Sequence, residues 1–164
     1  MKKVFLACLI ALSLFPLAGC DFFGPEAKEF TGSGITLTLD DSFYESENVS
    51  FPLYLVSLKH IFAGARELKS TLSPYGIRSL SAYAEAVLDN SGHSDVEVLV
   101  RDEDGHYYRY AYYTADVEGT EYGYMIVFLE GASHFYALNF GCLNKNLEES
   151  KEQYFAWADT IVVE

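Results

Sequence analysis

Apolar and polar residues alternate along several segments of the chain, and this alternation predicts β-strands. Ile35, Leu37 and Leu39 alternate with threonines, which is typical of a strand with one buried face. The segment 59–68 fits a strand or a helix, and we favour a strand over residues 61–67 followed by a helical turn. Further strands are predicted at 43–45 (a short one), 96–100, 106–114, 120–130, 134–142 and 160–163, and the run 51–58 is apolar and starts near a proline.

Two segments are predicted to be helices instead. Apolar residues with a spacing of three and four predict a helix over 79–88, with Ser79 or Ser81 as its cap and Gly92 as its end. A second helix is predicted to begin at Asn144 or Asn146 and to continue through residue 157. The spacing from Asn146 to Glu149 is that of a capping box. Strands, a helix, a strand meander, a helix and a last strand predict an α+β fold.

The first twenty residues differ in pattern from the rest. Two lysines precede an apolar run that is too short for a membrane-spanning helix, and the run ends in Leu17-Ala-Gly-Cys20. This ending resembles the lipobox of bacterial lipoproteins, which implies that residues 1–19 are a signal peptide and that Cys20 carries the lipid. The chain is then extracytoplasmic and lipid-anchored to the bacterial cell membrane. The alternative is an ordinary secretory signal with a chance cysteine.

The remaining chain has the length of a single domain. Gly, Pro, Ser and charged residues without periodicity predict a lipid-anchored linker over 20–33, with a reach of about 45 Å, and one domain over 34–164. Cys142 is then the only cysteine left in the domain, so no disulfide is predicted within it. We interpret Cys142 as a small buried apolar residue; a reactive or intermolecular thiol is the alternative.

The formal net charge of −13 narrows the range of partners. Nucleic acids need clustered Lys and Arg, so no nucleic-acid partner is expected. The excess of acidic residues also argues against broad docking on an anionic bilayer. The membrane is therefore expected to be contacted through the lipid on Cys20, with an envelope protein as the further partner.

Several sequence runs together resemble a known family. They are the Ile-Thr-Leu-Thr-Leu opening, the Lys-His-Ile-Phe-Ala-Gly-Ala-Arg-Glu run, Ser-Leu-Ser-Ala-Tyr-Ala before a helix, the tyrosine hairpin, Ser-His-Phe-Tyr-Ala-Leu-Asn-Phe and the closing Tyr-Phe-Ala-Trp-Ala-Asp-Thr-Ile-Val-Val. This pattern looks like small bacterial lipoproteins of the PsbP-like type. The resemblance implies an α/β/α sandwich with a central antiparallel sheet and helices on both faces. It also implies a binding or assembly role without catalytic residues; the photosystem role of PsbP itself is not carried over.

Tyrosines are the most prominent candidates for a binding site. We single out Tyr108, Tyr110, Tyr112 and Tyr124 as the lining of a groove, because tyrosine offers contact area and a hydroxyl at small entropic cost. The alternative is structural, since aromatic pairs also stabilise sheets.

Catalytic and metal-binding motifs are missing from the sequence. It contains no Gly-x-Ser-x-Gly elbow, P-loop or Cys-x-x-Cys. His106 and His134 could meet at one sheet end and hold zinc with Asp104 or Glu130, but their spacing is not that of a metal motif, and no cofactor or metal is expected. We therefore expect a binding or assembly module without its own catalytic activity. The alternatives are a small envelope hydrolase, a small-molecule-binding lipoprotein or a structural subunit of a membrane complex.

Overall fold

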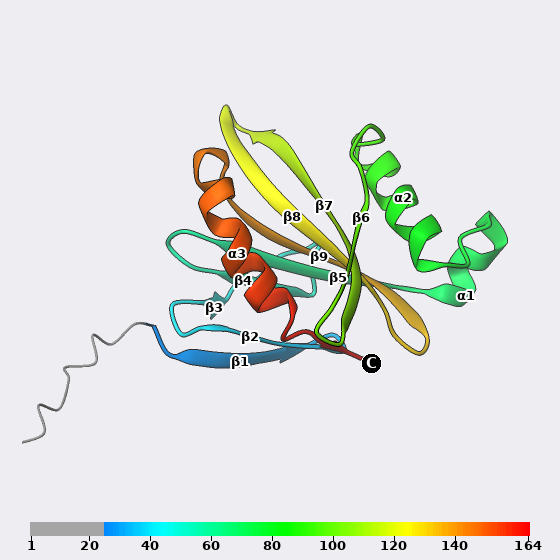
Figure 1. The fold of residues 1–164 in the computed structure, drawn as a ribbon, viewed down its shortest axis with the longest axis horizontal. Coiled ribbons are helices and arrows are strands. Elements are labelled where there is room, and N and C mark those ends of the chain that lie inside the picture. Colours follow the sequence, from blue (N-terminus) through cyan, green and yellow to red (C-terminus); the bar gives the residue numbers. More distant parts are fainter. Residues whose placement is uncertain (1–24) are drawn as a thin grey trace, which may run out of the picture.

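The computed structural model describes residues 25–164, and its main element is a seven-stranded antiparallel sheet (Figure 1). The strand order is β3-β4-β5-β9-β8-β7-β6. The sheet is a meander from β6 to β9, and β5 pairs with β9 at its centre. The bounds are β3 Tyr44–Glu45, β4 Leu53–Val56, β5 Ile61–Leu68, β6 Leu99–Glu103, β7 His106–Val117, β8 Thr120–Glu130 and β9 His134–Leu143.

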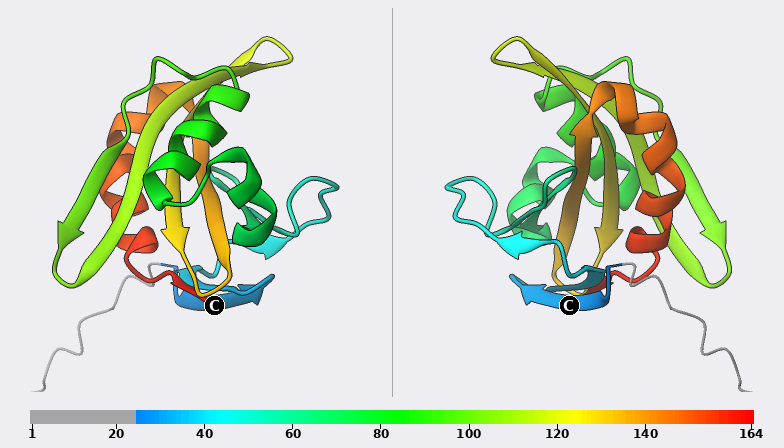
Figure 2. Two further views of the ribbon diagram at one scale, coloured as in Figure 1. Left: turned by 90° about the vertical axis from the view of Figure 1, so that its right-hand side faces the viewer. Right: turned by 90° about the vertical axis from the view of Figure 1, so that its left-hand side faces the viewer.

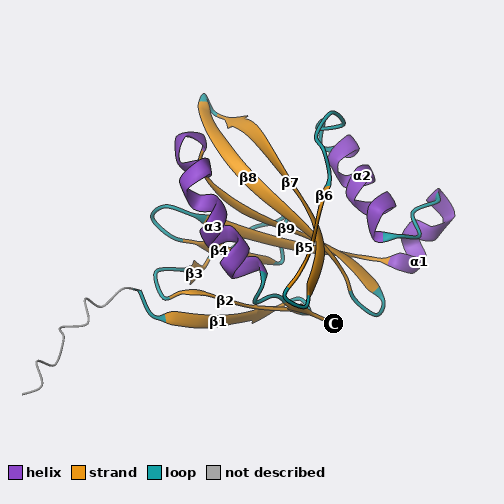
Figure 3. Ribbon diagram, viewed as in Figure 1, coloured by secondary structure: helices purple, strands orange, loops and turns teal. Residues whose placement is uncertain are grey.

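Helices cover both faces of this sheet (Figures 2 and 3). Helix α2 packs on one face and helix α3 on the other, and three shorter helical segments join them to the strands. Both the α+β class and the central antiparallel sheet with helices on its two faces are thereby confirmed. The bounds are α1 Lys69–Leu72, η1 Ser73–Tyr75, α2 Leu80–Asn90, η2 Asn144–Asn146 and α3 Leu147–Ala158.

Side chains alternate between two hydrophobic cores along each central strand, because successive residues of a strand point to opposite faces. On β8, Met125 and Val127 pack under α3, whereas Ile126 and Phe128 pack under α2. The α3 core also holds Trp157, which the helix presents to the sheet. Most of these side chains are fully buried, so the sheet is apolar on both faces as its sequence requires.

A second, three-stranded sheet was not predicted. It has the order β1-β2-β10, with bounds Ala27–Gly32, Ile35–Asp40 and Val162–Val163. The inward side chains of β2, Ile35, Leu37 and Leu39, are buried in the α3 core. The first and last strands of the chain thus close the side of the molecule beneath α3 (Figure 1).

This small sheet corrects the predicted linker of residues 20–33. Six of its residues form β1 and pair with β2 from Ala27↔Asp40 to Gly32↔Ile35. The two strands are joined by Ser33 and Gly34, both at positive φ. The segment lacks apolar periodicity because only Phe30 of β1 is buried. Residues 27–32 therefore belong to the folded domain and not to a linker.

One predicted turn and one predicted helix cap are confirmed, and one predicted capping box is wrong. Asp104 and Gly105 both have positive φ and form the predicted hairpin turn between β6 and β7. Ser79 caps α2 as predicted, since its hydroxyl accepts a hydrogen bond from the amide of Ala82 at 3.2 Å. The capping box at Asn146 is wrong, because residues 144–146 form a 3₁₀ turn that leads directly into α3 and the Asn146 side chain makes no cap bond.

The predicted signal peptide and Cys20 lie outside the described residues. Within residues 25–164, no helix has the length and apolarity that a membrane crossing demands. In the same range Cys142 is free and buried, at 2% exposure.

Candidate functional site

Three of the four candidate tyrosines lie side by side on β7, under α3. Tyr110 makes edge-to-face contacts with Tyr108, Tyr112 and Phe155, with ring centroids 6.4, 5.8 and 5.1 Å apart. The ammonium group of Lys151 lies 4.5 Å from the centroid of the Tyr112 ring. These rings fill the space between sheet and helix, so they contribute to packing.

Tyr124 is not brought together with the other three. It pairs with Tyr113 across β7 and β8, and the two rings stack with centroids 4.9 Å apart. Tyr113 belongs to the α2 side of the sheet, whereas Tyr110 and Tyr112 belong to the α3 side. The four residues therefore do not line one groove.

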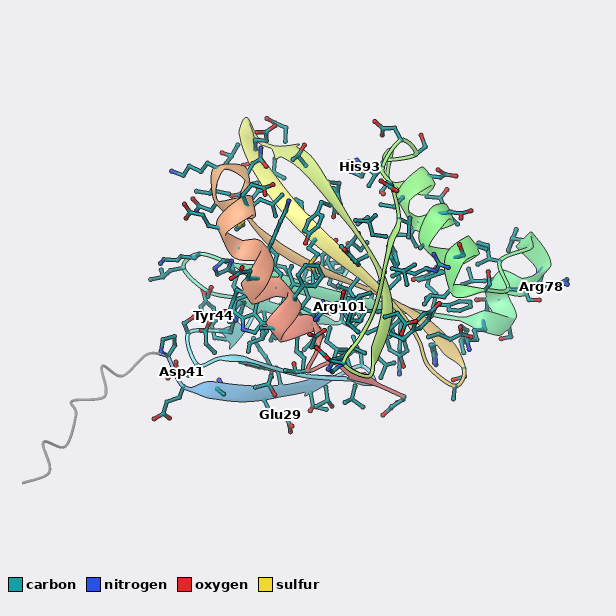
Figure 4. All side chains as sticks on the ribbon, in the orientation of Figure 1. Glu29, Asp41, Tyr44, Arg78, His93 and Arg101 are labelled. Carbon is teal, nitrogen blue, oxygen red and sulfur yellow. The ribbon has the colours of Figure 1, made fainter. Side chains whose placement is uncertain are left out.

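The hydroxyls of the α3-side tyrosines have different environments. Tyr108 donates to Oδ1 of Asp159 at 2.8 Å, and Arg101 holds the same carboxylate through Nε at 3.0 Å and a second nitrogen at 2.8 Å. Partial burial acts to raise the pKa of Asp159, but the hydrogen bonds from Arg101 and Tyr108 outweigh it and hold that pKa below its ordinary value. Figure 4 shows Arg101 between α3 and the edge of the large sheet. This cluster fastens the β6–β7 hairpin to the end of α3.

The Tyr112 hydroxyl has no such partner. Among the described residues it is a buried side-chain oxygen without a hydrogen bond. Burial raises the pKa of Tyr112 to about 12. The Tyr112 side chain lines neither of the two pockets that lie beside residues 57–60, the turn between β4 and β5.

The turn between β4 and β5, residues 57–60, positions a different polar group. The amide of Ser57 donates to the carbonyl of His60 at 2.8 Å, and the amide of His60 donates to the Ser57 hydroxyl at 3.0 Å. These bonds fix the turn and aim the His60 ring at α3. There its Nδ1 lies 3.1 Å from the Tyr154 hydroxyl, and its ring contacts Trp157 edge-on at 5.3 Å.

A pocket of about 320 Å³ opens beside His60, and we call it the tether-end pocket because Pro25, which belongs to the segment predicted to be a lipid-anchored linker, is part of its wall. Trp157 and Leu58 give it apolar surface, while a carboxylate, an ammonium group, an imidazole and an amide give it polar groups. Its lining is Pro25, Asp40, Ser42, Ser57, Leu58, Lys59, His60, Gln153 and Trp157. Its volume is at the lower end of the range for small-molecule sites.

A second pocket, of about 260 Å³, lies on the other side of the same turn. Cys142 and Tyr122 contribute to it, together with residues 57–61. The Cys142 thiol also neighbours the Tyr154 hydroxyl, whose pKa burial raises above its ordinary value. No acidic side chain lines this second pocket. A larger hollow, of about 690 Å³, is lined only by Glu45 of β3 and by residues of the loop between β3 and β4.

Burial determines the charge of His60. Desolvation lowers the pKa of His60 below its ordinary value of 6.5, and the nearby charge of Asp40 offsets this effect only in part. The imidazole is therefore neutral at neutral pH. If Tyr154 donates to Nδ1, the single imidazole proton resides on Nε2 and is available to a bound group.

The tether-end pocket contains Ser, His and Asp but not a catalytic triad. In a triad the histidine bridges acid and nucleophile. Here the Ser42 hydroxyl donates directly to Asp40, and Nδ1 of His60 is engaged by Tyr154. The arrangement provides a mixed polar and aromatic surface suited to binding.

Metal binding has no support in the described part of the chain. Among residues 25–164, no three His, Cys, Asp or Glu side chains converge in a way that could hold a metal ion. His106 pairs with Glu103 at the β6–β7 turn, and Nδ1 of His134 lies 2.9 Å from the Ser133 hydroxyl. The zinc site considered from the sequence is not assembled.

His60 was the residue that sequence reasoning missed. It lies in the segment 59–68, whose pattern fitted a strand or a helix, and it has no motif around it. One feature of the sequence could have identified His60. It lies in a short, mostly polar segment between two apolar runs, which is typical of a turn and not of the core.

Comparisons with known proteins bear on the fold. No protein-family model matches the sequence, and no curated protein matches it. Among solved structures, it is similar to the solution structure of cyanobacterial PsbP (CyanoP) from Synechocystis sp. PCC 6803, with 14% identity and a TM-score of 0.57. That match covers 92% of this chain and 100% of the other. The fold is PsbP-like.

A second solved structure extends the comparison. It is a crystal structure at 1.50 Å resolution from Bacteroides thetaiotaomicron VPI-5482, with 11% identity and a TM-score of 0.51. The match covers 80% of this chain and 45% of that one, so the PsbP-like chain spans less than half of this neighbour. At such identities the likeness concerns the fold, which agrees with the PsbP-like arrangement expected from the sequence.

Proposed function

We propose that this chain is a lipid-anchored, extracytoplasmic binding or assembly module without catalytic activity of its own, and that it binds through the tether-end pocket. The observation that carries the proposal is that Pro25 itself lines this pocket. Cys20 precedes Pro25 by five residues, which span at most about 18 Å when extended. A lipid on Cys20 would therefore hold the pocket close to the membrane surface.

The position of the pocket favours a partner at the membrane over one in bulk solution. Asp41, whose amide donates to the carbonyl of Glu26, and Tyr44 lie at one end of the molecule, whereas Arg78 lies at the opposite end (Figure 4). An acidic chain of net charge −13 is not attracted to anionic lipid. A protein partner near the bilayer is therefore favoured over the lipid surface, and the lipid anchor would supply the local concentration.

The absence of connected catalytic groups supports a module that binds without turnover. Asp40, Ser42 and His60 share the pocket, but their hydrogen bonds do not form a proton-transfer chain to a nucleophile. A small-molecule-binding lipoprotein is the second candidate, favoured by the pocket's volume of about 320 Å³ and its single aromatic wall at Trp157.

The test uses the full-length chain in its native membrane. Crosslinking followed by mass spectrometry should recover one reproducible protein partner from the wild type, and much less of it from Trp157→Ala at equal protein level. Recovery of no partner, together with saturable binding of a small molecule to the purified protein, would replace the assembly role with the ligand-binding role. Substrate turnover that is lost in His60→Gln, with the fold retained, would overturn both.

A further inference from the structure

The Ser57–His60 turn displays an apolar side chain on a rigid support. Leu58 is at its tip and is 105% exposed, so its entire side chain is in water. Three hydrogen bonds between Ser57 and His60 close the turn beneath it, including one from the Ser57 hydroxyl to the His60 carbonyl at 3.2 Å. A fixed, fully exposed leucine loses little conformational freedom when a partner covers it.

Two hollows flank this leucine. Leu58 and Lys59 belong to the walls of both the tether-end pocket and the pocket beside Cys142. The turn is therefore a ridge between two depressions, a shape that can interlock with side chains from another surface. An apolar side chain that a partner covers in a well-packed, desolvated pocket contributes to the binding energy of a protein interface.

Lys59 adds a charge that the described chain leaves unpaired. The ion pairs of residues 25–164 use Arg66, Lys69, Arg101 and Lys151, and none involves Lys59. In a chain with 24 acidic and 11 basic residues, a free cation beside an exposed leucine complements an anionic group on a partner.

We propose that this turn docks into a protein at the membrane, with Leu58 in an apolar socket and Lys59 facing a carboxylate of that protein. The inference rests on the proposed function and names its contact element. A lipid headgroup would also offer an anion, but Asp40 and Asp41 at the same end would be repelled by an anionic bilayer.

The experiment places a photoreactive amino acid at position 58 of the full-length lipoprotein in native membranes. Position 49 is the matched control, since Val49 is 107% exposed in a different loop, and position 75 samples the opposite end, where Tyr75 is 82% exposed. We expect an adduct with one protein from position 58 but not from 49 or 75. Leu58→Asp and Lys59→Glu should each lower recovery of that protein by about tenfold, and Val49→Asp should leave it unchanged.

Each other result has a distinct meaning. If position 58 forms adducts with lipid only, the turn contacts the bilayer and not a protein, and the inference is overturned. A partner that is recovered by general crosslinking and lost in Trp157→Ala, but gives no adduct from position 58, would overturn the inference and leave the proposed function intact. No protein partner under any crosslinking condition would overturn both. Because both leucine 58 and valine 49 are fully exposed, neither aspartate variant is expected to unfold the protein.

Discussion

The Nδ1 atom of His60 lies 3.1 Å from the hydroxyl oxygen of Tyr154, which joins the β4–β5 turn to the middle of α3. The turn is short and polar, and this bond together with the contact of the imidazole on Trp157 fixes it against the helix. A change in the charge of His60 should therefore be felt both in the stability of the domain and in the shape of the tether-end pocket.

Acidification should destabilise the domain through His60. Its pKa is lowered in the folded state relative to the ordinary value of 6.5, so the unfolded chain binds the proton more tightly. The stabilising effect of the neutral ring is complete above about pH 6.5 and is lost as the pH falls toward the folded pKa. Melting temperatures measured at about pH 7.5 and pH 5.5 should therefore differ less in His60→Gln than in the wild type. Equal differences in the two proteins would contradict this role.

The Asp159 carboxylate should contribute more to the free energy of unfolding than Glu103, the other acid that contacts Arg101. Asp159→Asn removes the charge that accepts two bonds from Arg101 and one from Tyr108, so we expect a loss of about 1–2 kcal/mol in the free energy of unfolding. Glu103→Gln is the control, because the Glu103 side chain is 70% exposed and its pair with Arg101 should contribute less than about 0.5 kcal/mol. Urea unfolding of the three proteins measures both values, and similar losses in the two variants would refute the assignment.

The same carboxylate should also shape the acid limb of the stability curve. Because the folded pKa of Asp159 lies below its ordinary 3.8, the stability it supplies is present above that value and is lost as the pH falls through the folded pKa. Asp159→Asn should consequently lose less stability than the wild type over this range. Urea titrations at several acidic pH values would detect the difference, and parallel curves would count against it.

Two tyrosines on one strand should respond oppositely to loss of the hydroxyl. Tyr112→Phe removes a buried oxygen that has no hydrogen-bond partner among the described residues, so stability should be unchanged or rise by about 1 kcal/mol. Tyr108→Phe removes the donor to Asp159 and should cost about 1–2 kcal/mol. Thermal or urea unfolding of this matched pair decides the matter. A larger loss at 112 than at 108 would show that the Tyr112 hydroxyl has a polar role.

Lipid attachment at Cys20 can be tested independently of the fold. In bacteria labelled with an alkyne fatty acid, the wild type should carry the label and Cys20→Ser should not. Retention of label in Cys20→Ser would exclude this residue as the lipid site.

Features that depend only on residues close together in the sequence could be predicted without the structure. The Asp104–Gly105 turn follows from two residues that tolerate positive φ, and the start of α2 follows from Ser79. The start of the last helix near Asn144 or Asn146 was predicted correctly, but the capping-box bond was not, since residues 144–146 form a 3₁₀ turn and the Asn146 side chain makes no cap bond.

The misplaced Tyr124 shows how one unrecognised turn changes the face of a whole strand. The two-residue turn Glu118–Gly119, with both residues at positive φ, pairs Val117 with Thr120 and hence Tyr113 with Tyr124. Even positions on β7 thereby share a face with odd positions on β8. Once that turn is identified, the sequence suffices to separate Tyr124 from Tyr112.

The tether-end pocket could not be predicted from local sequence patterns. Its walls come from the start of the described chain, the end of β2, the β4–β5 turn and α3, as Asp40, His60 and Trp157 illustrate. Only tertiary packing brings these segments together. The linker was misjudged for a related reason, since β1 is exposed except at Phe30 and is held in place by pairing with β2 rather than by its own apolar pattern.

The pairing of β2 with β10 has a consequence for the order of events in the cell. Thr36 pairs with Val162, and the central strand β5 pairs with β9, so each sheet contains one pairing that joins distant parts of the chain. A polypeptide leaving the ribosome cannot complete either sheet until nearly all of it has been made. Such nonlocal pairing delays folding. A chain that must be threaded through a membrane channel in extended form would gain time for export from this topology, and would reach its native state only on the far side.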